Sequence, residues 1–276
     1  MDGNVKNFSV LMSLYIKEKA EQFDECMKSI FSQTVLPNEI VIVLDGEINE
    51  GLQNVLSKYV NENPNLFNIV PLEKNVGLGL ALREGILHCK NELIARMDTD
   101  DICREDRFEL QIKAFEDNPE IDICGSQILE FEGDIENIVS KRTVPLTHDE
   151  IIKFQKKRDA FNHMTVMYKK SMVIKAGNYQ SCFLMEDSLL WANMFMAGAM
   201  GCNLDQYLVY VRVGKDMYGR RGGLSYYKKY KKGRKEIYKT GFINWWDYKI
   251  TALIQLVVSL APNKLRGFIY KHMLHR

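Results

Sequence analysis

Short apolar, β-branched runs alternate with helix-like stretches over the first 131 residues, and this alternation limits the possible folds more than any other feature. Apolar runs occupy residues 8–14 (FSVLMSL) and 39–44 (EIVIVL), and apolar residues recur at helical spacing between them, from 20 to 31. A strand, a helix and a strand with a short connector indicate a parallel βαβ unit. The pattern continues with a predicted strand at 66–72, helix at 79–89, strand at 93–97, helix at 104–115 and strand at 121–131.

This repetition predicts an α/β fold in which helices cover both faces of one open sheet. After residue 131 the order changes. Thr147 and Glu150 form the pattern of a capping box that begins a helix ending near Lys157. The remaining expected elements are a strand at 165–168, a helix at 186–197 and a last short strand at 207–211.

The charge of the chain is divided unevenly along its length. The whole chain of 276 residues carries a net charge of +1, but residues 212–276 hold 16 Lys or Arg and 3 Asp or Glu, a net of +13 that leaves −12 for the remainder. A basic segment of this kind faces anions such as lipid head groups, phosphates or nucleic acid. No recognised nucleic-acid module accompanies it, so we expect no nucleic-acid partner. We divide the chain into a catalytic domain at 1–213 and a basic, aromatic segment at 214–276.

The C-terminal segment has the composition of a helix that lies at a membrane surface. Trp245 and Trp246 precede an apolar run at 250–261, which is shorter than the roughly 20 residues that a spanning helix needs. We therefore expect peripheral association with the membrane, although the same residues could simply pack on the catalytic domain. Six cysteines without paired or metal-type spacing, and no secretory signal in residues 1–7, predict a cytoplasmic location.

Acidic residues follow two of the predicted strands and begin a later helix. Asp45 ends the second strand, Asp98, Asp100 and Asp101 follow the fourth, and Glu186 with Asp187 begins the helix. Ligands of open α/β sheets bind at the carboxyl ends of the strands. Three crowded carboxylates are suitable ligands for Mg²⁺ or Mn²⁺. The alternatives are that Asp100 or Asp101 caps the next helix, that Asp45 forms a turn with Gly46, and that the acids at 186–187 interact with the helix dipole.

These segments, in this order, resemble the family-2 inverting glycosyltransferases with a GT-A fold, and in particular the bacterial enzymes of O-antigen, capsule or exopolysaccharide synthesis. The resemblance extends from about Phe8 to Tyr227. The motifs that carry it are SVLMSLY with SIFSQT, EIVIVLDG, KNVGLGLALREGI, ELIARMDTDDICREDRFELQ, FNHMTVMYKK and MEDSLLW.

The resemblance implies a role for each matching position. Asp98, Thr99 and Asp100 look like the family's DxD motif, so Asp100 would be the leading metal ligand, Asp98 would lie nearer the ribose, and Asp101 could share either role. Asp45 matches the aspartate that accepts a hydrogen bond from the donor base, and Ser13 matches a position near the same nucleotide.

Other matching positions concern the acceptor and the diphosphate. Asp187, with Glu186, stands where the family has a general base that removes a proton from the acceptor hydroxyl. His163 matches a position near the donor phosphates or the acceptor, and Arg83 a position near the nucleotide. The pair Arg220 and Arg221 is expected to help hold the diphosphate.

We therefore predict an inverting hexosyltransferase that uses Mn²⁺ or Mg²⁺, a nucleotide diphosphate sugar such as a UDP-hexose, and a lipid-linked saccharide acceptor. Two alternatives belong to other classes. A nucleotidyltransferase needs a glycine-rich loop after the first strand, whereas residues 13–19 contain no glycine. A non-catalytic membrane-associated scaffold needs only the C-terminal segment. A Rossmann oxidoreductase is disfavoured because Gly77 and Gly79 are followed by Leu82 instead of a third glycine.

Overall fold

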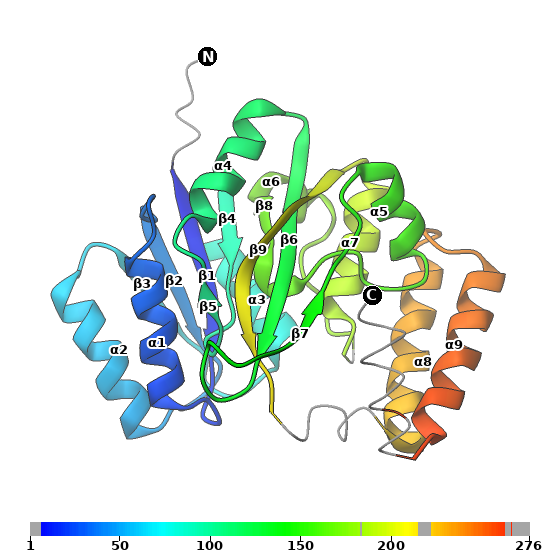
Figure 1. Ribbon diagram of the computed structural model, residues 1–276, viewed down its shortest axis with the longest axis horizontal. Coiled ribbons are helices and arrows are strands. Elements are labelled where there is room, and N and C mark those ends of the chain that lie inside the picture. The colour runs from blue at the N-terminus through cyan, green and yellow to red at the C-terminus, as the bar shows by residue number, and fades with distance from the viewer. Residues whose placement is uncertain (1–6, 183, 215–221, 263–265, 267–276) are drawn as a thin grey trace.

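The computed structural model describes residues 7–182, 184–214, 222–262 and 266 (Figure 1). Within these residues nine strands form one mixed sheet in the order β3-β2-β1-β4-β8-β6-β9-β5, and β7 pairs with β6. The strands are β1 (Phe8–Leu14), β2 (Glu39–Leu44), β3 (Phe67–Pro71), β4 (Leu93–Arg96), β5 (Ile102–Cys103), β6 (Ile121–Phe131), β7 (Ile138–Arg142), β8 (Met167–Lys169) and β9 (Met200–Arg212).

The first half of the sheet is parallel, as the βαβ pattern predicts. β1 pairs in parallel with β2 and β4, and β2 pairs in parallel with β3. The connecting helices are α1 (Ala20–Phe31), α2 (Glu50–Glu62), α3 (Leu78–His88) and α4 (Arg107–Asp117). All except α2 are confirmed predictions. Because parallel strands all point the same way, β1, β2 and β4 bring their carboxyl ends to one edge.

The two faces of the sheet have separate cores, because alternate side chains of a strand point to opposite faces. On one face, Val10 and Met12 of β1 pack with apolar residues of α1, α2 and α4. On the other face, Leu11 of β1 packs with α3 and with the later helices α5 (His148–Gln155), α6 (Lys170–Lys175) and α7 (Glu186–Met196). The expected covering of both faces by helices is confirmed.

The second half of the sheet is mixed. β8 is antiparallel to both β4 and β6, whereas β6 and β9 are parallel. The predicted short strand at 207–211 is wrong in its extent, because β9 begins at Met200 and pairs with β6 along most of its length. The capping box of Thr147 and Glu150 is present at the start of α5. A short 3-10 turn at His163–Thr165 precedes β8.

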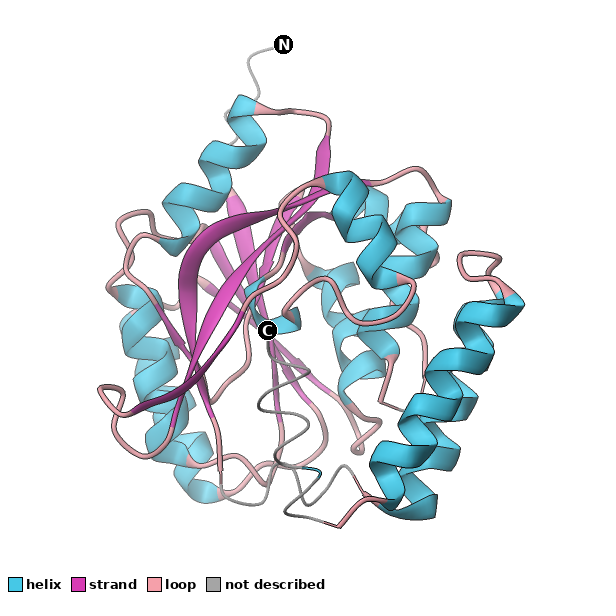
Figure 2. Ribbon diagram, turned by 45° about the vertical axis from the view of Figure 1, so that its right-hand side comes forward, coloured by secondary structure: helices cyan, strands magenta, loops and turns pink. Residues whose placement is uncertain are grey.

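Two helices follow the sheet and form a hairpin at its side (Figure 2). They are α8 (Gly223–Lys239) and α9 (Trp245–Leu260), which pack against each other while α8 packs on α7. A third apolar cluster joins the hairpin to α7 and to the segment before it, and its members are Cys182, Met185, Leu189, Ala192, Ile237, Phe242 and Ile243. No helix among the described residues is both long and apolar enough to cross a membrane.

The turn after β2 approaches the loop before α3 so closely that it needs glycine. Gly46 has φ of +85°, and a Cβ there would lie 2.7 Å from the backbone nitrogen of Asn75. The neighbouring Asp45 accepts hydrogen bonds from the backbone N–H groups of Val76 and Gly77, at 2.6 and 3.1 Å. Asp45 and Gly46 therefore fix the path of the chain into α3.

We expect Gly46→Ala to lower the free energy of unfolding more than Gly133→Ala. Gly133 also has a left-handed φ, +75°, but a Cβ there would meet nothing within 4 Å. Each substitution should lower the free energy of unfolding by about 1–2 kcal/mol, because alanine is strained in the left-handed conformation. Gly46→Ala should lower it by about 1–3 kcal/mol more, because its methyl group clashes with the loop. Urea unfolding followed by circular dichroism measures both. Equal losses would show that the loop at 75–77 moves freely to accommodate the methyl group.

Candidate active site

Three carboxylates from two segments lie near one another at the carboxyl ends of β1 and β4. Asp98 and Asp100 follow β4, and Glu18 lies in the loop between β1 and α1. Burial, followed by the charges of Asp100 and Asp98, raises the pKa of Glu18 to about 7. Burial and Asp98 raise the pKa of Asp100 to about 6. The part of the chain that the structure describes holds no ready group of three His, Cys, Asp or Glu for a metal ion. Two carboxylates completed by phosphate and water nevertheless fit Mg²⁺ or Mn²⁺.

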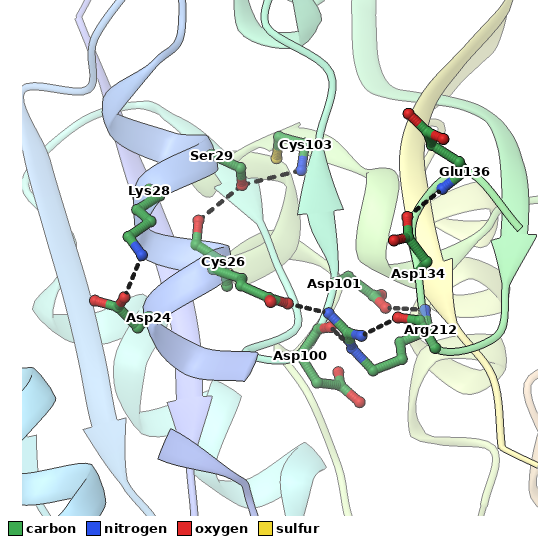
Figure 3. Close-up of polar contacts among 12 residues, drawn as sticks. Asp24, Cys26, Lys28, Ser29, Asp100, Asp101, Cys103, Asp134, Glu136 and Arg212 are labelled. Carbon is green, nitrogen blue, oxygen red and sulfur yellow. Dashed lines mark hydrogen bonds and ion pairs between the residues drawn. The ribbon is translucent and has the colours of Figure 1, made fainter. Parts of the chain in front are cut away.

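Asp101 differs from its two acidic neighbours, because its carboxylate is buried and 2% exposed. It accepts a hydrogen bond of 2.9 Å from the backbone N–H of Arg212 at the end of β9. The Arg212 side chain donates to the backbone carbonyl of Asp100 and pairs with Glu25 of α1 (Figure 3). Asp101 and Arg212 thus attach the acidic loop to β9 and α1.

The guanidinium of Arg96, the last residue of β4, lies buried among these acids and is 1% exposed. It pairs with Asp98. Its positive charge also acts to lower the pKa values of Asp100, Asp101 and Asp187, against the larger effect of their burial. Within the described chain, its Nε and Nη1 atoms have no hydrogen-bond partner. Arg96 therefore pairs with the loop after β4, and its charge also acts on Asp187 at the start of α7.

Two buried polar residues of α4, Arg107 and Gln111, hold the end of β4 in place. Arg107 donates from Nη2 to the backbone carbonyl of Arg96, at 2.7 Å, and from Nε to the side-chain oxygen of Gln111. Gln111 in turn donates to the backbone carbonyls of Cys124 and Thr165. These buried bonds fix the end of β4 relative to β6 and to the turn that carries His163.

The N-terminus of α3 lies against the N-terminus of α7. A Cβ on Gly79 would lie 2.8 Å from the Cβ of Glu186, so only glycine allows the two helices to approach this closely. Since Asp45 holds the residues just before α3, the end of β2 is connected to the start of α7 through a few rigid contacts. The structure brings Asp45, the acidic loop and the acids of α7 to the same edge of the sheet.

Asp187, the second residue of α7, has a strongly raised pKa. Burial, followed by the charges of Asp159 and Glu186, raises its pKa to about 8. One of its carboxylate oxygens accepts a hydrogen bond of 2.7 Å from the backbone N–H of Ser188, and the Ser188 hydroxyl donates to Asp159. With such a pKa the group is mostly protonated at pH 7, and it becomes able to accept a proton as the pH rises through about 8.

His163 lies beside Asp187 in the wall of one cavity and is held by aromatic neighbours. Its Nε2 is 2.8 Å from the hydroxyl of Tyr179, and its ring meets Trp191 edge-on. Burial and the charge of Arg96 keep the pKa of His163 well below its usual range. The imidazole is therefore neutral, and it can exchange hydrogen bonds with a ligand without adding charge.

The cavity that contains these residues has a volume of about 950 Å³ and lies between α7 and the hairpin. The acids Asp159, Glu186 and Asp187 line it together with His163. Its opposite wall comes from α8 and α9, more than 35 residues later in the chain. A space of this size is typical of ligand sites.

The other expected site residues lie in different settings. Ser13 is half-buried near the end of β1, in register with Val43. Arg83 is exposed on the second turn of α3, away from the helix start that meets α7. Arg220 and Arg221 lie outside the described residues.

Four residues of the site were missed by the sequence analysis: Glu18, Arg96, Asp159 and Arg212. The sequence signals were at Arg96 and Arg212, each of which ends an apolar stretch of its strand. An arginine in a buried strand needs an anion beside it. Glu18 and Asp159 stand among ordinary surface-type residues, so nothing in the pattern distinguishes them.

Comparison with known proteins finds glycosyltransferases. The model of the family "Glycosyl transferase family 2" matches residues 9–179. The amylovoran biosynthesis glycosyltransferase AmsE of Erwinia amylovora is 40% identical over 96% of this chain and 98% of its own length. The Escherichia coli UDP-Gal:alpha-D-GlcNAc-diphosphoundecaprenol beta-1,3-galactosyltransferase is 36% identical over 100% of this chain and 99% of its own.

A solved structure shares the fold at low sequence identity. The mannosyltransferase PcManGT from Pyrobaculum calidifontis, in complex with GDP-Man and Mn²⁺, aligns with a TM-score of 0.62 and 14% identity over 98% of this chain and 81% of that one. The parallel half-sheet, its acidic loop and the family model all lead to one assignment. The chain is a glycosyltransferase with a GT-A fold and belongs to glycosyl transferase family 2.

Proposed function

We propose that this protein transfers a hexose from a nucleotide diphosphate donor, most suitably a UDP-hexose, to a lipid-linked saccharide with inversion at the anomeric carbon. The observation that carries the proposal is Asp187, a carboxylate with a pKa of about 8 in the wall of a large cavity. The charge of Arg96, which pairs with Asp98 of the acidic loop, also acts on Asp187. The name of the Escherichia coli relative supports the donor and acceptor classes, and the name of AmsE supports a role in polysaccharide synthesis. The product would belong to a cell-surface polysaccharide such as O-antigen, capsule or exopolysaccharide.

In the proposed reaction Asp187 takes the proton of an acceptor hydroxyl while that oxygen attacks the anomeric carbon. The bond from this carbon to the diphosphate oxygen breaks, and the nucleoside diphosphate leaves with the electron pair. The new glycosidic bond forms on the face opposite the leaving group, so the configuration inverts. Glu186 and Asp159 assist by raising the proton affinity of Asp187, and the neutral His163 orients the acceptor.

The donor would lie along the carboxyl ends of β1, β2 and β4, with Ser13 and Asp45 beside the base and Arg83 near the nucleotide. Asp98 and Asp100 would hold Mn²⁺ or Mg²⁺, which neutralises charge on the diphosphate. Asp101 is proposed to support this loop through Arg212, because its carboxylate is already bonded there. Arg220 and Arg221 complete the proposal as further partners of the diphosphate.

The C-terminal segment, 214–276, is proposed to hold the enzyme at the inner face of the cell membrane. One side of α9 exposes apolar side chains, of which Trp246, Leu253 and Val257 are each more than 60% exposed. The neighbouring helix α8 carries six lysines, and all six are exposed: Lys228, Lys229, Lys231, Lys232, Lys235 and Lys239. Apolar area beside positive charge suits an anionic membrane surface.

Replacement of the proposed base tests the function directly. We expect Asp187→Asn to lower kcat by about 10²–10⁴-fold, because an amide cannot take the acceptor proton. The thermal shift produced by UDP with Mn²⁺ should remain. Glu186→Gln serves as the matched comparison and should lose much less. A non-catalytic scaffold, by contrast, would lose no measured function in either variant.

The pH dependence should follow the ionisation of Asp187. The carboxylate must be ionised to accept a proton, so kcat/KM should be low at pH 7 and rise with pH through a midpoint near 8, where the raised pKa lies. Asp159→Asn removes one of the charges that raise this pKa and should move the midpoint to lower pH. Asp117→Asn removes an exposed carboxylate at the end of α4 and should leave the midpoint unchanged. An unchanged midpoint in Asp159→Asn would contradict the assignment of the base.

The metal dependence should follow the acidic loop. We expect chelation by EDTA to abolish transfer and added Mn²⁺ or Mg²⁺ to restore it. Asp100→Asn should raise the Mn²⁺ concentration needed for half-maximal stimulation at least about tenfold, because one of two carboxylate ligands is lost. Thermal shift with UDP across a Mn²⁺ titration measures the same change without turnover. Full activity in EDTA would exclude this role for the loop.

A further inference from the structure

The cavity beside Asp187 combines three kinds of surface. Its inner wall is acidic, through Asp159 and Asp187. Lys157 and Lys229 add positive charge from two separate segments, the loop after α5 and the helix α8. Ile250, Ile254 and Val258 make the wall from α9 mainly apolar, and Thr251 and Gln255 also line it.

The apolar wall is continuous with the outside of the molecule. Ile250 and Ile254 line the cavity, yet each is 53% exposed, whereas Val258 is 5% exposed. The same helix carries the exposed residues Leu253 and Val257 on the adjoining side. A hydrocarbon chain can therefore pass from the surface of α9 into the cavity without leaving apolar contact.

The hairpin that forms this wall is held firmly to the catalytic part. Arg234 of α8 is 3% exposed, and it donates to the carbonyl of Lys156, at 2.6 Å, and to the hydroxyl of Thr251, at 3.1 Å. A Cβ on Gly233 would lie 2.9 Å from the sulfur of Met185, just before α7. Arg234 thus connects the end of α5 to α8 and α9. These contacts hold the walls of the cavity together.

From these observations, and building on the proposed function, we infer that this cavity is a binding site for the diphosphate and first isoprene units of the acceptor. The saccharide would face Asp187, the diphosphate would pair with Lys157 and Lys229, and the lipid chain would leave along Ile250 and Ile254. An amphiphile with an anion between a sugar and a hydrocarbon matches the arrangement of acid, base and apolar surface. The hairpin thereby selects lipid diphosphates over free saccharides.

Farnesyl diphosphate is a suitable probe, because it carries the diphosphate and an isoprenoid chain but no sugar. Binding is measured by isothermal titration calorimetry on the full chain in the absence of donor. Inorganic diphosphate and farnesol test the two halves of the ligand separately. Both should bind at least about tenfold more weakly than farnesyl diphosphate, since each loses one set of contacts.

Paired variants locate the probe in the cavity. The double variant Lys157→Gln/Lys229→Gln and the double variant Ile250→Ser/Ile254→Ser should each weaken binding about tenfold or more. Matched controls outside both the cavity and the C-terminal hairpin are Lys113→Gln/Lys153→Gln and Leu87→Ser/Ile174→Ser. They make the same chemical changes at exposed positions outside the cavity and should change the affinity less than about twofold.

Three outcomes would overturn the inference: no binding of farnesyl diphosphate to the wild-type chain, equal losses in the control variants, or full displacement of the probe by UDP with Mn²⁺. The last would place the probe in the donor site. Because the measurement needs neither donor nor turnover, it can succeed even where hexose transfer fails. Failure of the proposed function would instead appear as loss of transfer with probe binding intact.

Discussion

The gathering of acidic groups at one edge of this sheet depends on the buried guanidinium of Arg96. Carboxylates brought together in a medium of low dielectric repel one another and would be protonated or driven apart. Arg96 pairs with Asp98, and its charge also acts on Asp187. Its compensation is partial, because burial and the other acids still raise the pKa of Asp100 to about 6 and that of Asp187 to about 8. These two acids therefore hold protons more strongly than ordinary carboxylates do.

The sheet changes from parallel to mixed between the two parts of the site. The parallel strands β1, β2 and β4 end in polar residues, whereas the loop that holds Asp159 and the helix α7 carry the acids that face the cavity. Close packing joins the two parts, since Gly79 leaves no room for a methyl group beside Glu186. Arg107 and Gln111 add buried hydrogen bonds that hold the end of β4 and the turn before β8. The spacing of the acids at this edge of the sheet thus rests on small residues and buried polar bonds.

The hairpin of α8 and α9 has one buried side and one exposed side. The buried side shares a core with α7 and is fixed by Arg234, so it behaves as part of the catalytic unit. The exposed side leaves several large apolar residues in contact with solvent, an arrangement that is unfavourable unless a lipid or another surface covers them. Ile250 and Ile254 belong to both the exposed side and the cavity. In our proposals the same two turns of α9 thus serve membrane contact and acceptor binding.

The sequence by itself determined those features that arise from neighbouring residues. Strand and helix periodicity set the order of β1 to β4 with α1, α3 and α4, and the capping box at Thr147 and Glu150 set the start of α5. The helix α2 was also readable, since Leu52, Val55, Leu56 and Tyr59 recur at helical spacing, but it was overlooked. The tertiary structure alone decided that Glu18, Asp98 and Asp100 are neighbours, that β9 extends back to Met200 along β6, and that Asp159 approaches Asp187. Strand pairing and charge interaction between distant segments leave no periodic trace in the chain, because they depend on where the backbone returns in space.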